Sequence, residues 1–507
     1  MSTDYLIRIL RAQVYDVAIE TPLDYAKSLS KRIGNEVWLK REDLQPVFSF
    51  KLRGAYNKII QLSDEERGRG IIAASAGNHA QGVALAAERL GIKGTIVMPK
   101  TTPGIKVASV KSYGGNVVLH GNTYDEAYAH ARQIADEKGL TFIHPYDDPD
   151  VIAGQGTVAM ELLRQHLGKL DAIFVPVGGG GLIAGISVYI KQVNPEIKII
   201  GVEPEDAACL YEALKHDKRV VLDQVGIFAD GVAVRQIGEE PFRLAKQYVD
   251  EVIVASVDEI CAAIKDIFDD TRSIAEPAGA LAIAGLKKYV QREKCSEHNF
   301  IAIDSGANMN FDRLRYVAER AELGEQREAL LAVTITEEPG SFRRFCHTIG
   351  QRNITEFNYR YSDDRDAHVF VGIQLSGGEK EKQSVISRLE ENGYKILDIS
   401  NNEMAKLHIR YMVGGHATKA HDEIAYRFEF PERPGALLLF LTKMGQRWNI
   451  SMFHYRNHGA AYGRVLVGIQ VPRSEEGDFV AFLDDLGYPY WAESDNEAYK
   501  LFLGSLN

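Results

Sequence analysis

The sequence is poor in cysteine and has no excess of positive charge, and each shortage excludes a class of protein. Its four cysteines are scattered over 507 residues without a Cys-x-x-Cys pair, so disulfides do not hold the fold and a reducing, cytoplasmic environment is expected. Fifty-nine basic residues face 70 acidic ones, for a net charge of −11. Because no lysine- or arginine-dense tract offsets this balance, nucleic-acid binding is not expected.

Long apolar runs are also missing, with one near exception. The first 20 residues place charges among the apolar positions and contain no apolar core of a secretory signal. Residues 172–190 contain no charged side chain and are nearly long enough to cross a membrane. They include Pro176 and four consecutive glycines, which would destabilise a helix by roughly 3–4 kcal/mol relative to alanine. We therefore predict a strand, a glycine loop and a helix here, and no membrane span.

The residues that are present indicate several folded domains. The chain is too long for one ordinary hydrophobic core, so two to four domains are expected. From residue 71 to 204, short apolar runs alternate with amphipathic segments. We predict strands at 71–74, 95–99, 116–120, 141–144, 172–177 and 198–204, and helices at 79–91, 105–113, 124–139, 154–166 and 182–192.

This alternation predicts an α/β fold in which helices cover both faces of parallel sheets. Ligands of such folds bind at the carboxyl ends of strands, in the loops that lead into helices. One such loop contains Ser75, Gly77, Asn78 and His79. Amide N–H groups at the helix start suit a carboxylate or a phenolate oxygen, and an asparagine that only caps the helix is the alternative.

A second loop of this kind holds four consecutive glycines before an apolar helix. Its residues are Gly178, Gly179, Gly180, Gly181 and Leu182. Consecutive glycines let backbone amides wrap closely around a phosphate at a helix start, and a purely structural role explains four of them poorly. Because neither a P-loop nor a dinucleotide fingerprint is present, phosphate binding of another type is predicted.

Four further residues, in three segments, are candidates for chemistry. Lys51 lies between bulky apolar neighbours in Ser49-Phe50-Lys51-Leu52-Arg53-Gly54, and burial would lower its pKa and make it a nucleophile; a solvated surface lysine is the commoner alternative. Asp304 and Ser305 end an apolar run and either face a ligand or form a plain turn. Glu276 precedes a predicted helix, where an acid is favourable without any ligand.

The C-terminal third contains an internal repeat, which follows a charged helical connector at 313–330. The peptide Val371-Gly372-Ile373-Gln374 returns unchanged 96 residues later. Further matches in the same order pair Pro339-Gly340 with Pro434-Gly435, and Phe357-Asn358-Tyr359-Arg360 with Phe453-His454-Tyr455-Arg456. Matches in one order at nearly constant spacing indicate two copies of one module.

Each copy has the strand and helix order of a ferredoxin-like α+β module. In the first copy we expect strands at 330–336, 355–361, 367–374 and 405–411, and helices at 341–350 and 380–392. Pro339-Gly340 precedes the first helix, where backbone amides could hold a carboxylate. An ordinary turn also explains a Pro-Gly pair, and we favour the turn.

The lysine motif, the Ser-x-Gly-Asn-His motif and the four glycines together resemble, in type and order, the serine/threonine dehydratases, which are fold-type II pyridoxal-phosphate (PLP) enzymes. With the paired C-terminal modules, the whole chain is similar to the biosynthetic threonine dehydratases. The resemblance implies a PLP-dependent catalytic domain at 1–320 and two ACT-like regulatory modules at 328–412 and 422–507. It also implies a homotetramer.

The resemblance implies roles for the candidate residues. Lys51 would form a Schiff base with the cofactor, Phe50 would lie against its ring and Asn78 would bind its phenolic oxygen. Ser305 would meet the pyridine nitrogen; it is chosen over Asp304 because strand neighbours point in opposite directions and the family uses serine. The residues implied for the cofactor phosphate are Gly178, Gly179, Gly180, Gly181 and Leu182. Those implied for the substrate are Ser75, Gly77, Asn78 and His79.

The implied reaction is elimination of water from L-threonine, and from L-serine, to give 2-oxobutanoate or pyruvate and ammonia. Lys51 would remove the Cα proton, and either the cofactor phosphate or a nearby group such as Glu276 would protonate the departing hydroxyl. As the first committed step of isoleucine biosynthesis, the reaction would be inhibited by isoleucine and the inhibition relieved by valine. Candidates to line the effector site are Phe357, Tyr359, Arg360, Phe453, Tyr455 and Arg456. Aromatic residues on strands suit a core equally well, and both interpretations stay open.

Other functions fit the sequence less well. A serine racemase-like protein or a cysteine synthase would share the catalytic scaffold but usually lacks the repeat. An amino-acid sensor with a degenerate catalytic half would not need the intact lysine and glycine motifs, and a nicotinamide enzyme would need the missing fingerprint. His408, His416 and His421 have no carboxylate or cysteine to complete a set of ligands, so no metal is predicted.

Overall fold

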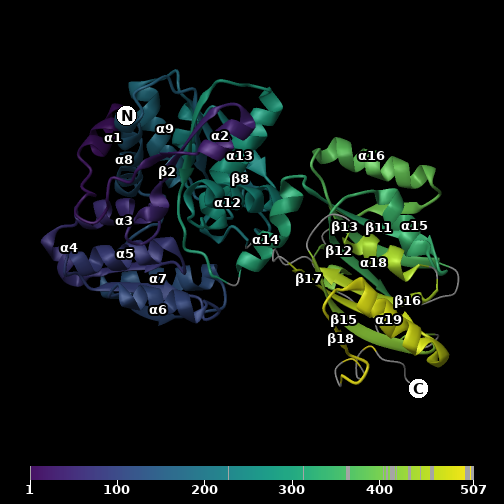
Figure 1. The fold of residues 1–507 in the computed structure, drawn as a ribbon. Coiled ribbons are helices and arrows are strands. Elements are labelled where there is room, and N and C mark those ends of the chain that lie inside the picture. Colours follow the sequence, from purple (N-terminus) through teal and green to yellow (C-terminus); the bar gives the residue numbers. More distant parts are fainter. Residues whose placement is uncertain are drawn as a thin grey trace. The chain divides into compact units, whose positions relative to one another are not determined.

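The computed structural model divides the chain into two compact units, Met1–Gly324 and Glu325–Asn507, and Figure 1 labels many of their elements. It describes residues 2–503 apart from 227, 312, 361–365, 403–404, 407–408, 412–416, 418–419, 432–435, 446, 457–461, 497–498 and 500–502. Within this described part, no helix is both long and apolar enough to span a bilayer.

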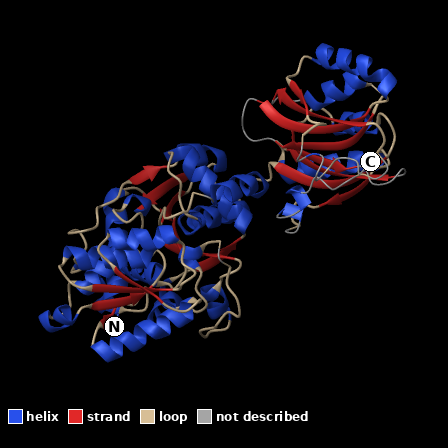
Figure 2. Ribbon diagram, turned by 90° about the horizontal axis from the view of Figure 1, so that it is seen from below, coloured by secondary structure: helices blue, strands red, loops and turns tan. Residues whose placement is uncertain are grey.

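The helices of the first unit lie between and around its strands (Figure 2). They are α1 (Ser2–Leu10), α2 (Lys27–Ile33), α3 (Lys51–Ile59), α4 (Asp64–Arg69), α5 (Asn78–Arg89), α6 (Gly104–Ser112), α7 (Tyr124–Lys138), α8 (Pro149–Gln165), α9 (Gly181–Val193), α10 (Cys209–Lys215), α11 (Glu239–Tyr248), α12 (Val257–Thr271), α13 (Pro277–Glu293) and α14 (Arg313–Gly324). Short 3-10 turns occur at η1 (Glu42–Leu44) and η2 (Asp230–Val232).

The larger sheet of this unit has six strands in the order β1-β2-β10-β7-β8-β9. They are β1 (Leu23–Tyr25), β2 (Glu36–Arg41), β7 (Ala172–Pro176), β8 (Lys198–Pro204), β9 (Glu251–Ala255) and β10 (Asn299–Asp304). All neighbours are parallel except β1 and β2. On β7, Ala172 and Phe174 pack with residues of α12 and α13, whereas Ile173 and Val175 pack with α8 and α9. Helices therefore cover both faces, as predicted.

The smaller sheet has four parallel strands in the order β5-β4-β3-β6. They are β3 (Ile71–Ala74), β4 (Gly94–Met98), β5 (Asn116–Leu119) and β6 (Thr141–Phe142). On β3, Ile71 and Ala73 pack with residues of α3 and α5, whereas Ile72 and Ala74 pack with α7. Because both faces of this strand are buried, it is apolar throughout its length.

One helix of the first unit differs clearly from its predicted bounds. Helix α8 begins at Pro149, five residues before the expected start at residue 154. The Asp148 carboxylate caps the helix by accepting hydrogen bonds from the N–H groups of Asp150 (2.8 Å) and Val151 (3.2 Å). An aspartate N-cap followed by proline is a strong start signal, and it extends the helix beyond the segment that its apolar pattern marks.

The second unit is built on one eight-stranded antiparallel sheet in the order β14-β11-β13-β12-β16-β17-β15-β18. The strands are β11 (Glu328–Thr336), β12 (Ile354–Arg360), β13 (Asp366–Gln374), β14 (Lys395–Asp398), β15 (Glu423–Pro431), β16 (Asn449–Arg456), β17 (Tyr462–Gln470) and β18 (Tyr490–Ala492). Helices α15 (Ser341–Ile349), α16 (Gly378–Glu391), α18 (Ala436–Met444) and α19 (Glu476–Leu486) share one hydrophobic cluster with the sheet. The two halves repeat the predicted order, and β12 joins β16.

The predicted last strand of the first copy, 405–411, is wrong. The last strand is β14, which begins two residues after Gly393, whose φ is 84°, and pairs with β11. Ala405 is helical instead, and its N–H donates to the Asn402 side chain at 3.0 Å; such a cap competes with a strand. Ile409–Tyr411 forms a 3-10 turn. Pro434, Gly435, His408 and His416 lie outside the described residues.

Candidate active site

Most candidate residues of the first unit lie in loops at the carboxyl ends of β3, β7 and β10, the position expected for a ligand site. Lys51 instead begins α3, and Glu276 immediately precedes α13. Two main-chain hydrogen bonds join the segment before Lys51 to the end of β10. The Phe50 N–H donates to the Ser305 carbonyl (3.3 Å), and the Ala307 N–H donates to the Phe48 carbonyl (2.9 Å). The structure therefore brings the lysine motif and Ser305 together, although they lie far apart in the sequence.

Lys51 is the first residue of α3. Its backbone N–H donates to Ser49 Oγ at 3.2 Å, and its Nζ lies 5.2 Å from the centroid of the Phe50 ring. Burial of the amine lowers the pKa of Lys51 to about 8, and the nearby charge of Glu276 opposes this shift only in part. A larger fraction of this amine is therefore neutral near pH 7 than of a solvated lysine, and the neutral form attacks carbonyl carbons and accepts protons.

Close neighbours restrict the loop at 178–181 to glycine. A Cβ on Gly179 would lie 2.1 Å from the ring of Tyr146, and a Cβ on Gly178 would lie 2.9 Å from the backbone of Val232. Gly180 has a φ of 90°, in the left-handed region that favours glycine. The loop is therefore packed as closely as a backbone allows.

This loop fits a phosphate group. The backbone N–H groups of 178–182 donate no hydrogen bond to any described residue. They lie at the N-terminus of the 13-residue helix α9, where the helix dipole favours an anion. All five residues are buried, so an anion bound here is shielded from water. Residues Gly178, Gly179, Gly180, Gly181 and Leu182 therefore suit the phosphate of PLP.

Asn78 forms part of a hydrogen-bonded chain of two amides and one carboxyl. Its Nδ2 donates to Glu276 Oε1 at 2.6 Å, and its Oδ1 accepts a hydrogen bond of 2.7 Å from Asn308 Nδ2. Asn308 Nδ2 also donates to the carbonyl of Val47 at 2.8 Å. Asn308 was not among the predicted site residues, and its only sequence signal is its place three residues after Ser305.

Glu276 is buried at the start of α13 and is 3% exposed. Burial raises its pKa to about 7, and the negative charge of Asp230 adds to the shift. A carboxyl with this pKa holds its proton for about half of the time at neutral pH and can donate it to a departing group. The hydrogen bond from Asn78 opposes the shift but does not cancel it.

The loop at 75–77 is only partly buried. The Gly77 N–H donates to Ser75 Oγ at 3.3 Å, and a Cβ on Gly77 would meet no atom within 4 Å, so the loop borders open space. The imidazole of His79 is buried instead, and its Nε2 bonds to the Ile143 carbonyl at 2.9 Å. Burial lowers the pKa of His79 to about 3, so this side chain is neutral.

Ser305 and Asp304 are both buried at the end of β10. The Ser305 hydroxyl donates to the Ala278 carbonyl at 3.3 Å, a long bond that leaves its oxygen able to accept or exchange a partner. Burial raises the pKa of Asp304 well above its usual range, and the negative charge of Asp43 adds to the rise. The choice of Ser305 as the partner of the pyridine nitrogen stays a prediction.

In the second unit, the repeated aromatic strands lie directly opposite each other. Across β12 and β16, Phe357 pairs with Tyr455 and Tyr359 pairs with Phe453. All four side chains are buried in the same hydrophobic cluster, and the Tyr359 hydroxyl bonds to the Glu337 carboxylate. These aromatics thus have a core role. The backbones of Arg360 and Arg456 belong to the paired strands, but their side chains lie outside the described residues.

The chain is similar to known pyridoxal-phosphate enzymes. The family of pyridoxal-phosphate dependent enzymes matches residues 14–306, and the C-terminal regulatory domain of threonine dehydratase matches twice, at 319–409 and 414–503. A biosynthetic L-threonine dehydratase from Burkholderia multivorans is 57% identical over 505 residues, 99% of each chain. Its Escherichia coli counterpart is 53% identical over 500 residues, 99% of this chain and 97% of that one. A solved structure of processed threonine deaminase isoform 2 from Solanum lycopersicum is 52% identical, with a TM-score of 0.62 over 63% of this chain and 93% of its own.

These similarities confirm the predicted resemblance, the fold-type II α/β catalytic part with two C-terminal α+β modules, and the dependence on PLP. The roles given to single residues and the boundaries of the domains stay predictions. With relatives more than half identical over almost its whole length, the chain belongs to the biosynthetic threonine dehydratases, PLP-dependent enzymes with a C-terminal regulatory region.

Proposed function

We propose that the protein eliminates water from L-threonine, and from L-serine, to give 2-oxobutanoate or pyruvate with ammonia, as the first committed step of isoleucine biosynthesis. One observation carries the proposal: main-chain hydrogen bonds join the segment of Lys51, whose pKa is lowered, to the end of β10, within a fold whose glycine loop suits a phosphate. The names of relatives at 53–57% identity support threonine as the substrate.

Lys51 would hold the cofactor covalently and then act as the base. When bound, PLP supplies an electron sink for the electron pair left on Cα. The amine of Lys51 removes the Cα proton, a task that a pKa of about 8 suits near neutral pH. Phe50 would lie against the ring, Asn78 would donate a hydrogen bond to the phenolic oxygen and the Ser305 hydroxyl would meet the pyridine nitrogen. The fold has already buried these three side chains, so they need little reordering.

The substrate would be held at the partly exposed loop of 75–77. Its carboxylate would accept hydrogen bonds from Ser75 and from backbone N–H groups of Gly77, Asn78 and His79 at the start of α5, where the helix dipole favours an anion. Glu276, with its pKa of about 7, would give its proton to the β-hydroxyl as that group leaves as water. Ammonia leaves when the enamine product tautomerises and is hydrolysed.

We infer a division of labour along the chain, with a catalytic domain at 1–320 and regulatory modules at 328–412 and 422–507. The twofold match to a regulatory domain supports small-molecule effectors, which we propose to be isoleucine and valine. An effector site at the junction of β12 and β16 would bring together Tyr359, Arg360, Tyr455 and Arg456. Each effector would shift threonine affinity through its preference for one conformation. A cytoplasmic homotetramer completes the proposal.

Lys51→Ala should abolish formation of 2-oxo acid from threonine and the yellow colour of the purified protein, while circular dichroism shows an intact fold. Lys138→Ala is the matched control, because Lys138 is an exposed residue in the last turn of α7. The proposal fails if Lys51→Ala keeps its activity. Adding isoleucine, and then valine, to the wild-type assay tests the proposed effectors.

A further inference from the structure

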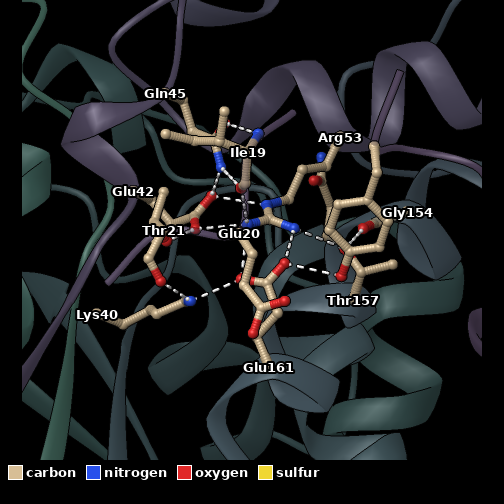
Figure 3. Close-up of polar contacts among 12 residues, drawn as sticks. Ile19, Glu20, Thr21, Lys40, Glu42, Gln45, Arg53, Gly154, Thr157 and Glu161 are labelled. Atoms are coloured by element: carbon tan, nitrogen blue, oxygen red, sulfur yellow. Dashed lines mark hydrogen bonds and ion pairs between the residues drawn. The ribbon is translucent and has the colours of Figure 1, made fainter. Parts of the chain in front are cut away.

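Four fully buried charged residues form a cluster that no step of the proposed reaction uses. The buried ion cluster consists of Lys40, Glu42, Arg53 and Glu161, each 0% exposed. Figure 3 shows the guanidinium of Arg53 between the carboxylates of Glu42 and Glu161. The cluster joins four elements, because Lys40 lies on β2, Glu42 on the 3-10 turn η1, Arg53 on α3 and Glu161 on α8.

Arg53 uses every donor of its guanidinium. Nε and Nη2 donate to the two oxygens of Glu42 at 2.7 and 2.8 Å. Nη1 and Nη2 donate to the two oxygens of Glu161 at 2.6 and 3.0 Å. Nη1 also reaches Thr157 Oγ1 at 3.1 Å, and Nη2 reaches the Ile19 carbonyl at 3.2 Å. A planar fork held on two sides can adopt only one orientation.

The rest of the cluster is equally well paired. Lys40 Nζ donates to Glu161 Oε2 and the Thr21 carbonyl, both at 2.6 Å, and to Gln165 Oε1 at 3.0 Å. Two positive charges balance two negative ones. Taking four charges out of water is costly, and a buried salt bridge is weak support for a stabilising role. We therefore expect that this fully paired cluster specifies the orientation of the elements that it joins.

The position of Arg53 indicates what the cluster specifies. Arg53 lies two residues after Lys51 in the first turn of α3, so the two side chains leave the helix on nearly opposite sides. Next to it, a Cβ on Gly54 would lie 2.7 Å from the Val151 carbonyl, and a Cβ on Gly154 would lie 2.7 Å from Gly54 Cα. Helices α3 and α8 thus touch through their backbones, and Arg53 fixes the rotation of α3 at this contact.

We propose that Arg53 is a positioning residue: its guanidinium, gripped by Glu42 and Glu161, holds the first turn of α3 so that the Lys51 amine faces the cofactor ring. The inference rests on the role proposed for Lys51. Burial and the charge of Glu276 shift the pKa of Lys51, and Arg53 does not contribute to this shift. Arg53 therefore acts through geometry, and a lysine in its place, with the same charge but no fork, cannot replace it.

Arg53→Lys in the full-length holoenzyme tests the proposal. We expect kcat for threonine to fall by about 10²-fold, the size of effect that a misplacement of about 1 Å can produce, while KM changes little. Borohydride followed by peptide mass spectrometry should show a smaller fraction of cofactor fixed to residue 51 than in the wild type. Apoprotein titrated with PLP should bind it more weakly.

Arg320→Lys is the matched control. Arg320 is also buried and pairs with a carboxylate, that of Asp258, but it joins α14 to α12, which carry none of the predicted site residues. If both variants lose thermal stability and both keep wild-type kcat and cofactor fixation, Arg53 is merely structural and the proposal is overturned. If Arg53→Lys does not fold, Glu161→Gln, which keeps the shape of the side chain, replaces it with the same two outcomes. Wild-type protein that fixes no cofactor at residue 51 would instead contradict the proposed function.

Discussion

Lys51 and Glu276 both titrate outside their ordinary ranges, and burial is the main cause in both residues. It lowers the pKa of Lys51 to about 8 and raises that of Glu276 to about 7. The two pKa shifts have opposite signs: the amine of Lys51 releases its proton at a lower pH than a solvated lysine, and the carboxyl of Glu276 keeps its proton to a higher pH than a solvated glutamate. One site can thereby supply a base and an acid at the same pH. The neutral His79, by contrast, is not suited to carry a proton.

Glu276→Gln tests whether Glu276 protonates the departing hydroxyl. We expect kcat to fall by roughly 10²-fold and the alkaline limb of the pH profile to change. In the wild type the protonated carboxyl is the active form, so the Glu276 contribution to kcat declines as pH rises through about 7. Because glutamine does not titrate, the pH profile of kcat for Glu276→Gln should lack that decline. An unchanged kcat and profile would remove Glu276 from the reaction.

The same shift predicts how stability depends on pH. The folded carboxyl keeps its proton up to a pH of about 7, whereas the unfolded chain releases it near the ordinary value of 4.5. The folded state therefore binds more protons in this window, and the free energy of unfolding contributed by Glu276 falls as pH rises through it. Denaturant titrations of wild type and Glu276→Gln across this window should diverge in that direction; parallel curves would contradict the raised pKa.

Sequence patterns could identify Lys51, because its apolar neighbours predict burial and its motif resembles a known family. They could not identify the hydrogen bonds that join Asn78 to Glu276 and Asn308. Those three residues lie in separate segments, and only the packing of both parallel sheets brings them together. The same is true of Arg53, whose four partners come from three other parts of the chain.

At the scale of elements, prediction succeeds where periodicity and end signals coincide. Strands β3 and β8 have the predicted bounds, since apolar runs end there at turn residues. The start of α8 and the last strand of the first module were missed for a common reason. In both, a side chain that caps a turn, Asp148 or Asn402, decides the backbone conformation against the apolar pattern.

The close packing of the glycine loop before α9 predicts that a larger residue there weakens cofactor binding. Gly179→Ala should weaken PLP binding to the apoprotein at least tenfold and destabilise the fold by about 1–3 kcal/mol, the usual cost of overpacking. The cause is the Cβ, which would lie 2.1 Å from the Tyr146 ring. Gly104→Ala is the control, because its Cβ would meet no atom within 4 Å. Equal cofactor affinity in the two variants would mean that the loop does not hold the phosphate.

At the scale of the whole molecule, the chain combines an α/β unit with a duplicated antiparallel one. The repeat predicted two modules because it is visible in the sequence. It could not predict which edge strands join, since the pairing of β12 with β16 depends on contacts between residues almost a hundred positions apart. The aromatic residues of the repeat turned out to be core residues, whatever further role the junction has.

A chain that stops after Gly324 tests the proposed division of labour. We expect it to form 2-oxobutanoate from threonine at a rate within an order of magnitude of the full chain and to be insensitive to isoleucine, because the PLP-family match ends at residue 306. The assay compares both proteins with and without isoleucine. Inhibition of the shortened protein would place the effector site in the first unit, and complete loss of activity would show that the second unit supports catalysis.

Every residue role proposed for the site depends on a covalent bond between Lys51 and the cofactor. Borohydride reduction of the yellow, full-length protein, followed by peptide mass spectrometry, shows which lysine forms this bond. We predict one modified peptide, with the mass of reduced pyridoxal phosphate on residue 51, and none on the neighbouring Lys58 of α3. Modification at another lysine, or a protein that stays colourless and unmodified after PLP is supplied, would contradict the account.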